Sequence, residues 1–223
     1  MTGPKKQRSP KARTLRRAAA LLLLLAVCWA TGLYGLLPRQ GIYYSEETAN
    51  MGRTSVILDM GRIPLKKTGY SRAYLCANDN GMLVALTRFY LLYGWMDYGF
   101  NALDCSREEP LHVSTYSISK RTEDGYGQIW YLYGRVDAAE GESLRASVGY
   151  EDSGGQWVSA EELELTRGED WFEAGGRTYF IAPLPMGTKE DESVSAQVRV
   201  ELLDGQGDSL WEGRVIGGGT GLG

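Results

Sequence analysis

Residues 143–150 read SLRASVGY, and this stretch decides the fold class. The apolar residues Leu144, Ala146, Val148 and Tyr150 occupy every second position, with polar or small residues between them. Successive side chains of a strand point to opposite faces of its sheet, so this period predicts a strand with one buried face. Such a strand is typical of an antiparallel sheet, because parallel strands are apolar on both faces.

Strand and turn patterns extend in both directions from this stretch. Residues 194–202 alternate in the same way, Gly175-Gly176 predicts a hairpin between 171–174 and 177–182, and 204–208 predicts a turn before a last strand at 210–216. Asn80-Gly81 predicts a second hairpin, joining 73–79 to 82–90, although a helix over 82–93 is an alternative. Further strands are expected at 55–60, 111–119, 128–136 and 157–166, and residues 94–110 are expected to be irregular. Residues 128–136 are aromatic on both faces, which predicts a central strand or one that faces a partner.

These segments predict a mainly β chain in which residues 55–216 form an antiparallel β-sandwich-like domain. Two subdomains, 55–127 and 128–216, are an alternative division. Residues 128–216 have the size of an immunoglobulin-like sandwich but lack its Cys–Trp–Cys framework. The glycine-rich residues 217–223 are expected to be a flexible tail.

Charge is divided unevenly along the chain. Residues 1–17 carry seven bases and no acid, whereas the remaining residues carry 17 bases and 28 acids, a net charge of −11. The basic segment adjoins an apolar stretch, which favours a membrane rather than a nucleic acid as its partner. An acidic remainder repels nucleic acid, so none is expected as a partner.

Residues 18–37 read AAALLLLLAVCWATGLYGLL, twenty residues without a charge. As a helix they would reach about 30 Å, the thickness of a hydrocarbon core. The sequence therefore predicts a single-pass signal-anchor helix in the lipid bilayer, ended by Pro38. The basic residues 1–17 stay in the cytoplasm, residues 38–54 form a juxtamembrane spacer, and the β-domain lies outside. A cleaved secretory signal, which would release the domain, is the main alternative; a lipoprotein site at Cys28 fits less well because Val27 is bulky.

The exported part contains two cysteines, Cys76 and Cys105. In an oxidising compartment they are expected to form one disulfide, with two buried free thiols as the alternative.

Residues with catalytic potential are few. His112 is the only histidine, and a nucleophilic pair with Cys105 is weakly indicated. No spacing of Cys or His predicts a metal site, and no cofactor is expected. Acidic clusters at 161–164, 169–173 and 190–192 could supply paired carboxylates for hydrolysis, but a solvated acidic surface is the simpler interpretation.

Aromatic residues indicate a binding surface. Trp95, Tyr98 and Phe100 lie in a segment expected to be a loop, where binding residues often collect. The sequence thus predicts an extracytoplasmic module that binds an envelope protein or a glycan without catalysis. A membrane-tethered hydrolase using carboxylates is the alternative.

Overall fold

The computed structural model describes residues 10–31, 35–64, 70–122, 125–151, 155–185 and 197–216. Over these residues the chain is mainly β, as the sequence predicts, with two helices and antiparallel strands. The helices are α1 (Pro10–Ala30) and α2 (Pro38–Thr48). The strands are β1 (Ser55–Pro64), β2 (Tyr70–Ala77), β3 (Gly81–Tyr90), β4 (Gly94–Asp104), β5 (Leu111–Thr122), β6 (Gly125–Val136), β7 (Gly141–Glu151), β8 (Trp157–Thr166), β9 (Trp171–Ala174), β10 (Arg177–Pro183), β11 (Gln197–Asp204) and β12 (Ser209–Ile216).

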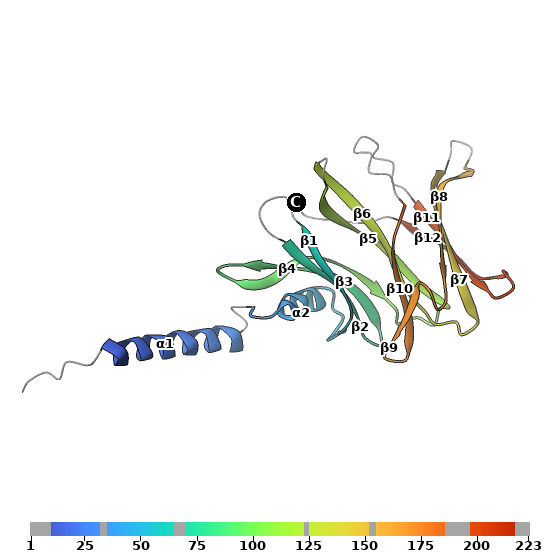
Figure 1. Cartoon of the computed structure of the whole chain (residues 1–223). Helices are drawn as coiled ribbons and strands as arrows, with labels where there is room; N and C mark the ends of the chain where they lie inside the picture. Colours follow the sequence, from blue (N-terminus) through green and yellow to red (C-terminus); the bar gives the residue numbers. More distant parts are fainter. Residues whose placement is uncertain are drawn as a thin grey trace, which may run out of the picture.

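The described strands form three four-stranded sheets that stack on one another (Figure 1). The first sheet has the order β1-β2-β3-β4, the second β5-β6-β10-β9, and the third β12-β11-β7-β8. Apolar side chains of the second and third sheets form one core, which includes Leu132, Phe180, Leu144 and Val200. The opposite face of the second sheet packs on the first through a separate core, which includes Tyr133 and Val84. The second sheet is therefore the middle layer and is covered on both faces.

Strand β6 shows how the sequence specifies this layering. Trp130, Leu132 and Val136 contribute to the core shared with the third sheet, whereas Tyr131 and Tyr133 contribute to the core shared with the first. Because neighbouring side chains point to opposite faces, a strand apolar at consecutive positions can fill two cores at once. The prediction of a central strand at 128–136 is confirmed. The alternative boundary at 127/128 falls inside β6, which pairs with β5 from Leu111↔Val136 to Thr122↔Gly125.

Helix α2 covers the outer face of the first sheet. Its Ile42 packs with Tyr74, Cys76, Leu83 and Ala85 in a third cluster. Residues 38–54, expected to be a juxtamembrane spacer, thus include a helix that packs on this sheet. The buried stripe of α2 consists of Gly41, Ile42, Ser45 and Glu46, so its helical period is carried mostly by small and polar residues. Pro38 begins this helix instead of ending the previous one, because the first helical position needs no N–H donor.

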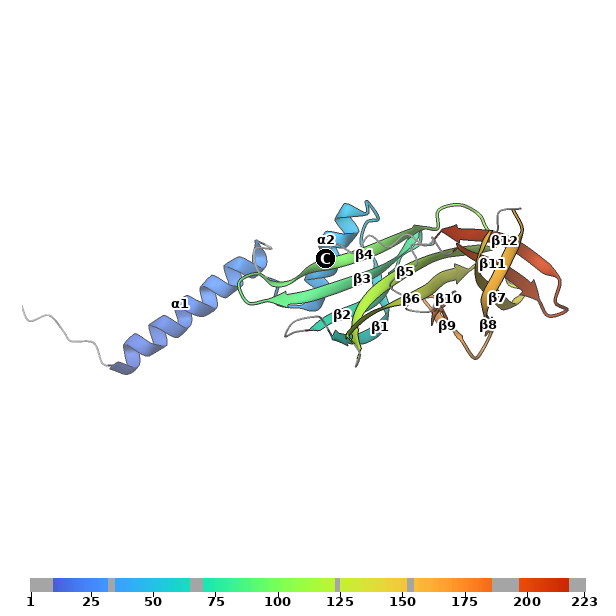
Figure 2. The ribbon, with the colours of Figure 1, turned by 90° about the horizontal axis from the view of Figure 1, so that it is seen from above.

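Helix α1 begins in the basic segment and ends at Ala30, so it does not have the expected bounds of 18–37. It extends away from the stacked sheets (Figures 1 and 2). Within the part of the chain that the structure describes, no helix has an apolar stretch of 18 residues sufficient to cross a membrane. Residues 217–223, the expected tail, lie outside the described residues.

The expected hairpins form, with one change of register. Gly175 and Gly176 have φ of 60° and 78° and join Ala174 to Arg177, as a type I′ turn requires. The other hairpin turns at Asp79-Asn80, one residue earlier than predicted, because Asn78 Oδ1 accepts hydrogen bonds from the amides of Asn80 and Gly81. Residues 94–104, expected to be irregular, form strand β4, which pairs with β3.

Candidate functional site

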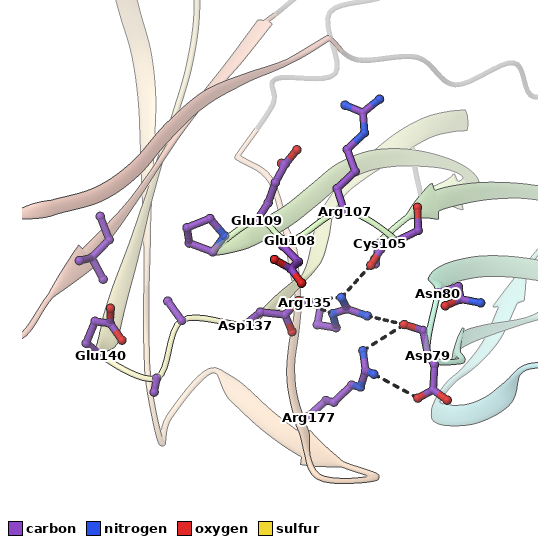
Figure 3. Close-up of a pocket in the computed structure, with 15 residues that line it drawn as sticks. Asp79, Asn80, Cys105, Arg107, Glu108, Glu109, Arg135, Asp137, Glu140 and Arg177 are labelled. Carbon is purple, nitrogen blue, oxygen red and sulfur yellow. Dashed lines mark hydrogen bonds and ion pairs between the residues drawn. The ribbon is translucent and has the colours of Figure 1, made fainter.

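A cavity of about 730 Å³ opens where connections from all three sheets meet (Figure 3). Its walls are the β2–β3 turn, the β4–β5 connection, and the β6–β7 connection. Arg177 of β10 and Leu210 of β12 complete the lining. The cavity thus lies at the junction of the three layers. Apart from a few strand residues, its lining consists of short connections between strands.

Arg135, at the end of β6, holds two of these walls together. Its side chain is 4% exposed. The guanidinium donates to the carbonyl of Asp79 at 3.2 Å, to the carbonyl of Cys105 at 2.9 Å, and to Asp137 Oδ2 at 2.9 and 2.6 Å (Figure 3). A buried guanidinium needs such partners, since an unpaired one would lose its hydration without compensation. Arg135 therefore fixes the first sheet to the second at the base of the cavity.

Arg177 supports the same turn from β10. It donates to the carbonyl of Asp79 and to Asp79 Oδ1, both at 3.1 Å. Asn78 shapes the turn from the other side through its own side-chain hydrogen bonds. Asp79 is consequently held by two arginines, and neither guanidinium is free to bind an anion by itself.

The mouth of the cavity carries the charges without partners. Among the described residues, the side chains of Arg107, Glu108, Glu109 and Glu140 form no hydrogen bond or ion pair within the chain. Because Asp79 and Asp137 are paired with the two arginines, the unpaired groups leave the mouth with an excess of two negative charges. Such a site attracts a ligand with positive charge.

Cys105 and His112 lie beside this cavity but do not form a nucleophilic pair. Burial raises the pKa of the Cys105 thiol to about 11. Burial and the neighbouring Arg135 lower the pKa of His112, so its ring is neutral at pH 7. A catalytic cysteine needs the opposite arrangement, a thiolate stabilised by a cationic neighbour. His112 Nε2 lies 3.4 Å from Asp137 Oδ2 and is a buried structural group.

The disulfide expected between Cys76 and Cys105 is not formed. Both are free thiols. Cys76 packs under α2 in the cluster with Ile42, whereas Cys105 packs in the core between the first and second sheets. They lie on opposite faces of the first sheet, which prevents their sulfurs from meeting.

Trp95, Tyr98 and Phe100 lie on strand β4 and not on a loop. Trp95 stacks edge-on against Phe89 with ring centroids 5.8 Å apart, and Phe100 packs in the cluster under α2. Tyr98 lies beside Arg88, whose guanidinium carbon is 5.4 Å from the ring centroid. The three rings have separate surroundings, and their contact with a ligand stays a prediction.

The two acidic clusters that the structure describes, 161–164 and 169–173, do not line the cavity. Glu161, Glu162 and Glu164 are exposed on β8, an edge strand of the third sheet. Asp170 Oδ2 accepts a hydrogen bond from the amide of Thr166 within a turn. Residues 190–192 lie outside the described residues. Among the residues described, no three side chains of His, Cys, Asp or Glu gather as a metal site would require.

The cavity residues were missed at the level of sequence, although one signal pointed to Arg135. It lies in a segment, QIWYLYGRV, that is apolar or aromatic on both faces. A charged residue in such a strand is expected to be buried and paired, because charged side chains are rarely buried otherwise. No signal connects Arg135 to Asp79 or Cys105, which are distant in sequence.

Comparison with known proteins gives no match: no protein-family model fits this chain, and neither curated proteins nor solved structures resemble it significantly.

Proposed function

We propose that this chain is a membrane-anchored, extracytoplasmic binding module. In this proposal the N-terminal apolar segment, residues 18–37, holds the chain in the bilayer as a single pass, with the basic residues 1–17 in the cytoplasm. The stacked β-domain lies outside and binds a protein or glycan partner without catalysis. Cleavage of the N-terminal segment would instead give the same domain as a secreted protein.

The surface of α1 is the observation that carries the anchor. Leu21, Leu22, Leu23 and Leu24 are 58–67% exposed, and none of the core clusters of the described residues includes a residue of α1. Consecutive exposed leucines cover the helix on all sides, so no single protein face could bury them all. A hydrocarbon environment can, because it surrounds the helix.

Site-directed labelling tests the orientation. Cysteine is introduced into the full-length chain lacking Cys28 (Cys28→Ser), either at Thr2 or at Gln206, an exposed turn residue. In intact cells a membrane-impermeant maleimide is expected to label the Gln206→Cys variant and not the Thr2→Cys variant. Labelling of Thr2→Cys alone, or recovery of both variants in the soluble fraction, would refute the anchor as proposed.

The cavity beside Arg135 supports the binding role. Its frame is fixed by Arg135 and Arg177, and its mouth presents the unpaired carboxylates of Glu108, Glu109 and Glu140. A rigid frame lowers the ordering cost of binding, and the negative excess favours a positively charged ligand. A Lys- or Arg-containing segment of an envelope protein has this chemistry.

The same carboxylates are the specific feature that a tethered hydrolase would use. Glu108 and Glu140 are exposed, Glu109 is half-buried, and Asp137 is held by Arg135. A carboxyl that acts as a general acid is shielded from solvent in an apolar setting, whereas Glu108 and Glu140 face solvent and Asp137 is already paired. Binding is therefore the function that this geometry supports better.

Charge reversal at the mouth tests the binding role. A photo-crosslinking residue replaces Ala139, which lines the cavity, in the full-length chain. Crosslinks to one partner are expected to disappear in the Glu108→Arg/Glu109→Arg variant. They should persist in Glu161→Arg/Glu162→Arg, which changes the net charge equally on β8. Equal crosslinking in both variants would exclude recognition by the cavity carboxylates.

A further inference from the structure

The β3–β4 hairpin ends in an exposed apolar surface. Leu91 and Leu92 at its turn are 83% and 77% exposed. We call a set of six residues the apolar tip. It consists of Leu91 and Leu92 together with Phe89, Tyr93, Leu36 and Leu37, and each of them is at least 44% exposed. Single exposed apolar residues are ordinary, but a contiguous group of this kind marks a surface that contacts another apolar phase.

Hydrogen bonds join the two parts of the apolar tip. The amide of Gly35 donates to the carbonyl of Tyr93 at 2.9 Å, and the amide of Trp95 donates to the carbonyl of Gly35 at 2.7 Å. A Cβ added to Gly35 would lie 2.2 Å from the carbonyl oxygen of Trp95, so this close approach requires glycine. Gly35 is thereby fixed against the hairpin turn.

The apolar tip must lie near the end of α1. Five residues lead from Ala30, the last residue of α1, to Gly35. A chain of that length spans at most about 18 Å. In both views the C-terminal end of α1 lies beside the β3–β4 hairpin (Figures 1 and 2). A bilayer that contains α1 therefore has the apolar tip at its outer surface.

Charge at the apolar tip fits the same location. Residues 80–96 and 31–45 contain no acid and one base each, in a chain whose remainder after residue 17 has a net charge of −11. The base on the hairpin, Arg88, lies over the ring of Tyr90 at 5.2 Å. Acidic side chains would be repelled by anionic headgroups, whereas Arg and Tyr are favoured at the membrane interface.

The length of α1 is an independent reason to expect the apolar tip in contact with the membrane. The apolar part of α1, residues 18–30, is about 20 Å long, whereas a hydrocarbon core is about 30 Å thick. A short helix leaves a mismatch that neighbouring apolar groups can fill. Leu36, Leu37 and the hairpin turn are exposed apolar groups of this kind near the end of α1.

We propose that the apolar tip inserts into the outer leaflet of the bilayer that holds α1, as a second membrane contact; this inference rests on the anchor proposed above. It also orients the cavity. Strand β3 runs from Gly81, next to the cavity, to Tyr90, next to the apolar tip. Ten residues of strand span roughly 33 Å, so insertion places the cavity mouth well away from the lipid surface.

Fluorescent probes on the full-length chain test the insertion. The chain carries Cys28→Ser and one new cysteine, Leu92→Cys, Leu22→Cys on α1, or Ala160→Cys on β8, labelled with an environment-sensitive dye. The buried Cys76 and Cys105 are left in place. Each protein is reconstituted in vesicles of phosphatidylcholine and phosphatidylglycerol, with or without nitroxide-labelled lipid. We expect lipid quenching and a blue-shifted emission at positions 92 and 22, and neither at 160.

The other outcomes separate the two proposals. Lipid quenching at 22 together with iodide quenching at 92 would overturn insertion of the apolar tip and leave the anchor intact. Iodide quenching at 22 would overturn the anchor itself. A probe at 92 that neither lipid nitroxide nor iodide quenches would show that protein, such as a second copy, covers the apolar tip, and would also overturn insertion.

Discussion

Glu46 Oε1 accepts a hydrogen bond from the amide of Thr54 at 2.7 Å and another from the Thr54 hydroxyl at 2.5 Å. The carboxylate is 1% exposed. Arg53 Nη1 lies 3.0 Å from Glu46 Oε2, and Arg39 also contacts the backbone carbonyl of Thr54. A buried charge at this position connects α2 to the start of β1, so the helix that a sequence reader takes for a spacer is bound to the first sheet.

Replacing Glu46 should loosen this connection. Glu46→Ala leaves the amide and hydroxyl of Thr54 and the guanidinium of Arg53 without their shared acceptor, and we expect a loss of about 3–5 kcal/mol in the free energy of unfolding. Glu47→Ala is the matched control, since Glu47 is exposed on the same helix and should change stability by less than about 0.5 kcal/mol. Urea unfolding of the full-length chain in detergent measures both. Equal effects would show that Glu46 does not fix α2.

Replacing the buried Arg135 should lower the free energy of unfolding more than replacing the exposed Arg145. Arg135→Met retains the apolar stem but leaves the carbonyls of Asp79 and Cys105 and the carboxylate of Asp137 without their donor. We expect this variant to lose about 3 kcal/mol or more in its free energy of unfolding. Arg145→Met, whose side chain is 48% exposed, should cost less than about 1 kcal/mol. Loss of stability that is the same in both variants would contradict the role of Arg135 as the connection between the first and second sheets.

The strands were predictable where their period was visible. Leu144, Ala146 and Val148 are buried as their alternation predicts, and the aromatic residues of β6 fill two cores. Tyr150 continues the pattern in sequence but is 47% exposed, because it lies near the end of β7. The local period therefore predicts the strand and its buried face, except near the end of the strand.

The rest of the fold depends on contacts that local patterns do not encode. Strand β4 contains two glycines and a register shift opposite Leu86, which conceals its alternation. Helix α2 buries Gly41, Ser45 and Glu46, residues that carry no apolar period. The cavity combines three connections that lie between residues 79 and 140 with Arg177 and Leu210 from later strands, and only the stacking of three sheets brings them together.

Gly134 lies so close to neighbouring strands that a side chain at this position should destabilise the fold. A Cβ there would lie 2.2 Å from the carbonyl oxygen of His112 and 2.6 Å from Phe180 Cζ. Gly134→Ala is expected to lower the free energy of unfolding by about 3 kcal/mol, since both neighbours belong to packed strands. Gly205→Ala is the control, because its nearest neighbour is Glu142 Cγ at 3.5 Å. If Gly134→Ala unfolds at the same urea concentration as the parent, the packing of β5 on β6 is looser than described.

Asp97 should give stability an unusual dependence on pH. Burial raises the pKa of its carboxyl above 3.8, and the hydrogen bond from Ser45 offsets this only in part. The folded chain therefore binds this proton more tightly than the unfolded chain, and protonation favours folding. The penalty for the charged form is present above the folded pKa and disappears as pH falls below 3.8. We expect the stability of Asp97→Asn relative to the parent to be greatest at pH 7 and to decrease toward pH 3.

A second aspartate provides the control of opposite sign. Amide groups of Asp208 and Gln206 lower the pKa of Asp204, so its charged form contributes stability above the unfolded pKa that is lost in acid. The stability of Asp204→Asn relative to the parent should therefore increase as pH falls from 7 to 3. Urea titrations at several pH values measure both differences. The same trend in both variants would contradict the assignment for Asp97.

The two buried thiols should stay unreactive until the chain unfolds. Burial raises the pKa of Cys76 to about 12 and that of Cys105 to about 11. At pH 8 the thiolate, which is the reactive form, is then roughly one part in a thousand or fewer, against about one quarter for an ordinary cysteine. In a Cys28→Ser background, both thiols are expected to react with iodoacetamide at least about 100-fold more slowly in the folded chain than in guanidinium. Mass spectrometry of the unfolded, unreduced chain counts the labels. Two labels agree with free thiols on opposite faces of the first sheet, whereas none would mean that Cys76 and Cys105 are bonded, and their placement on opposite faces of that sheet would then be wrong.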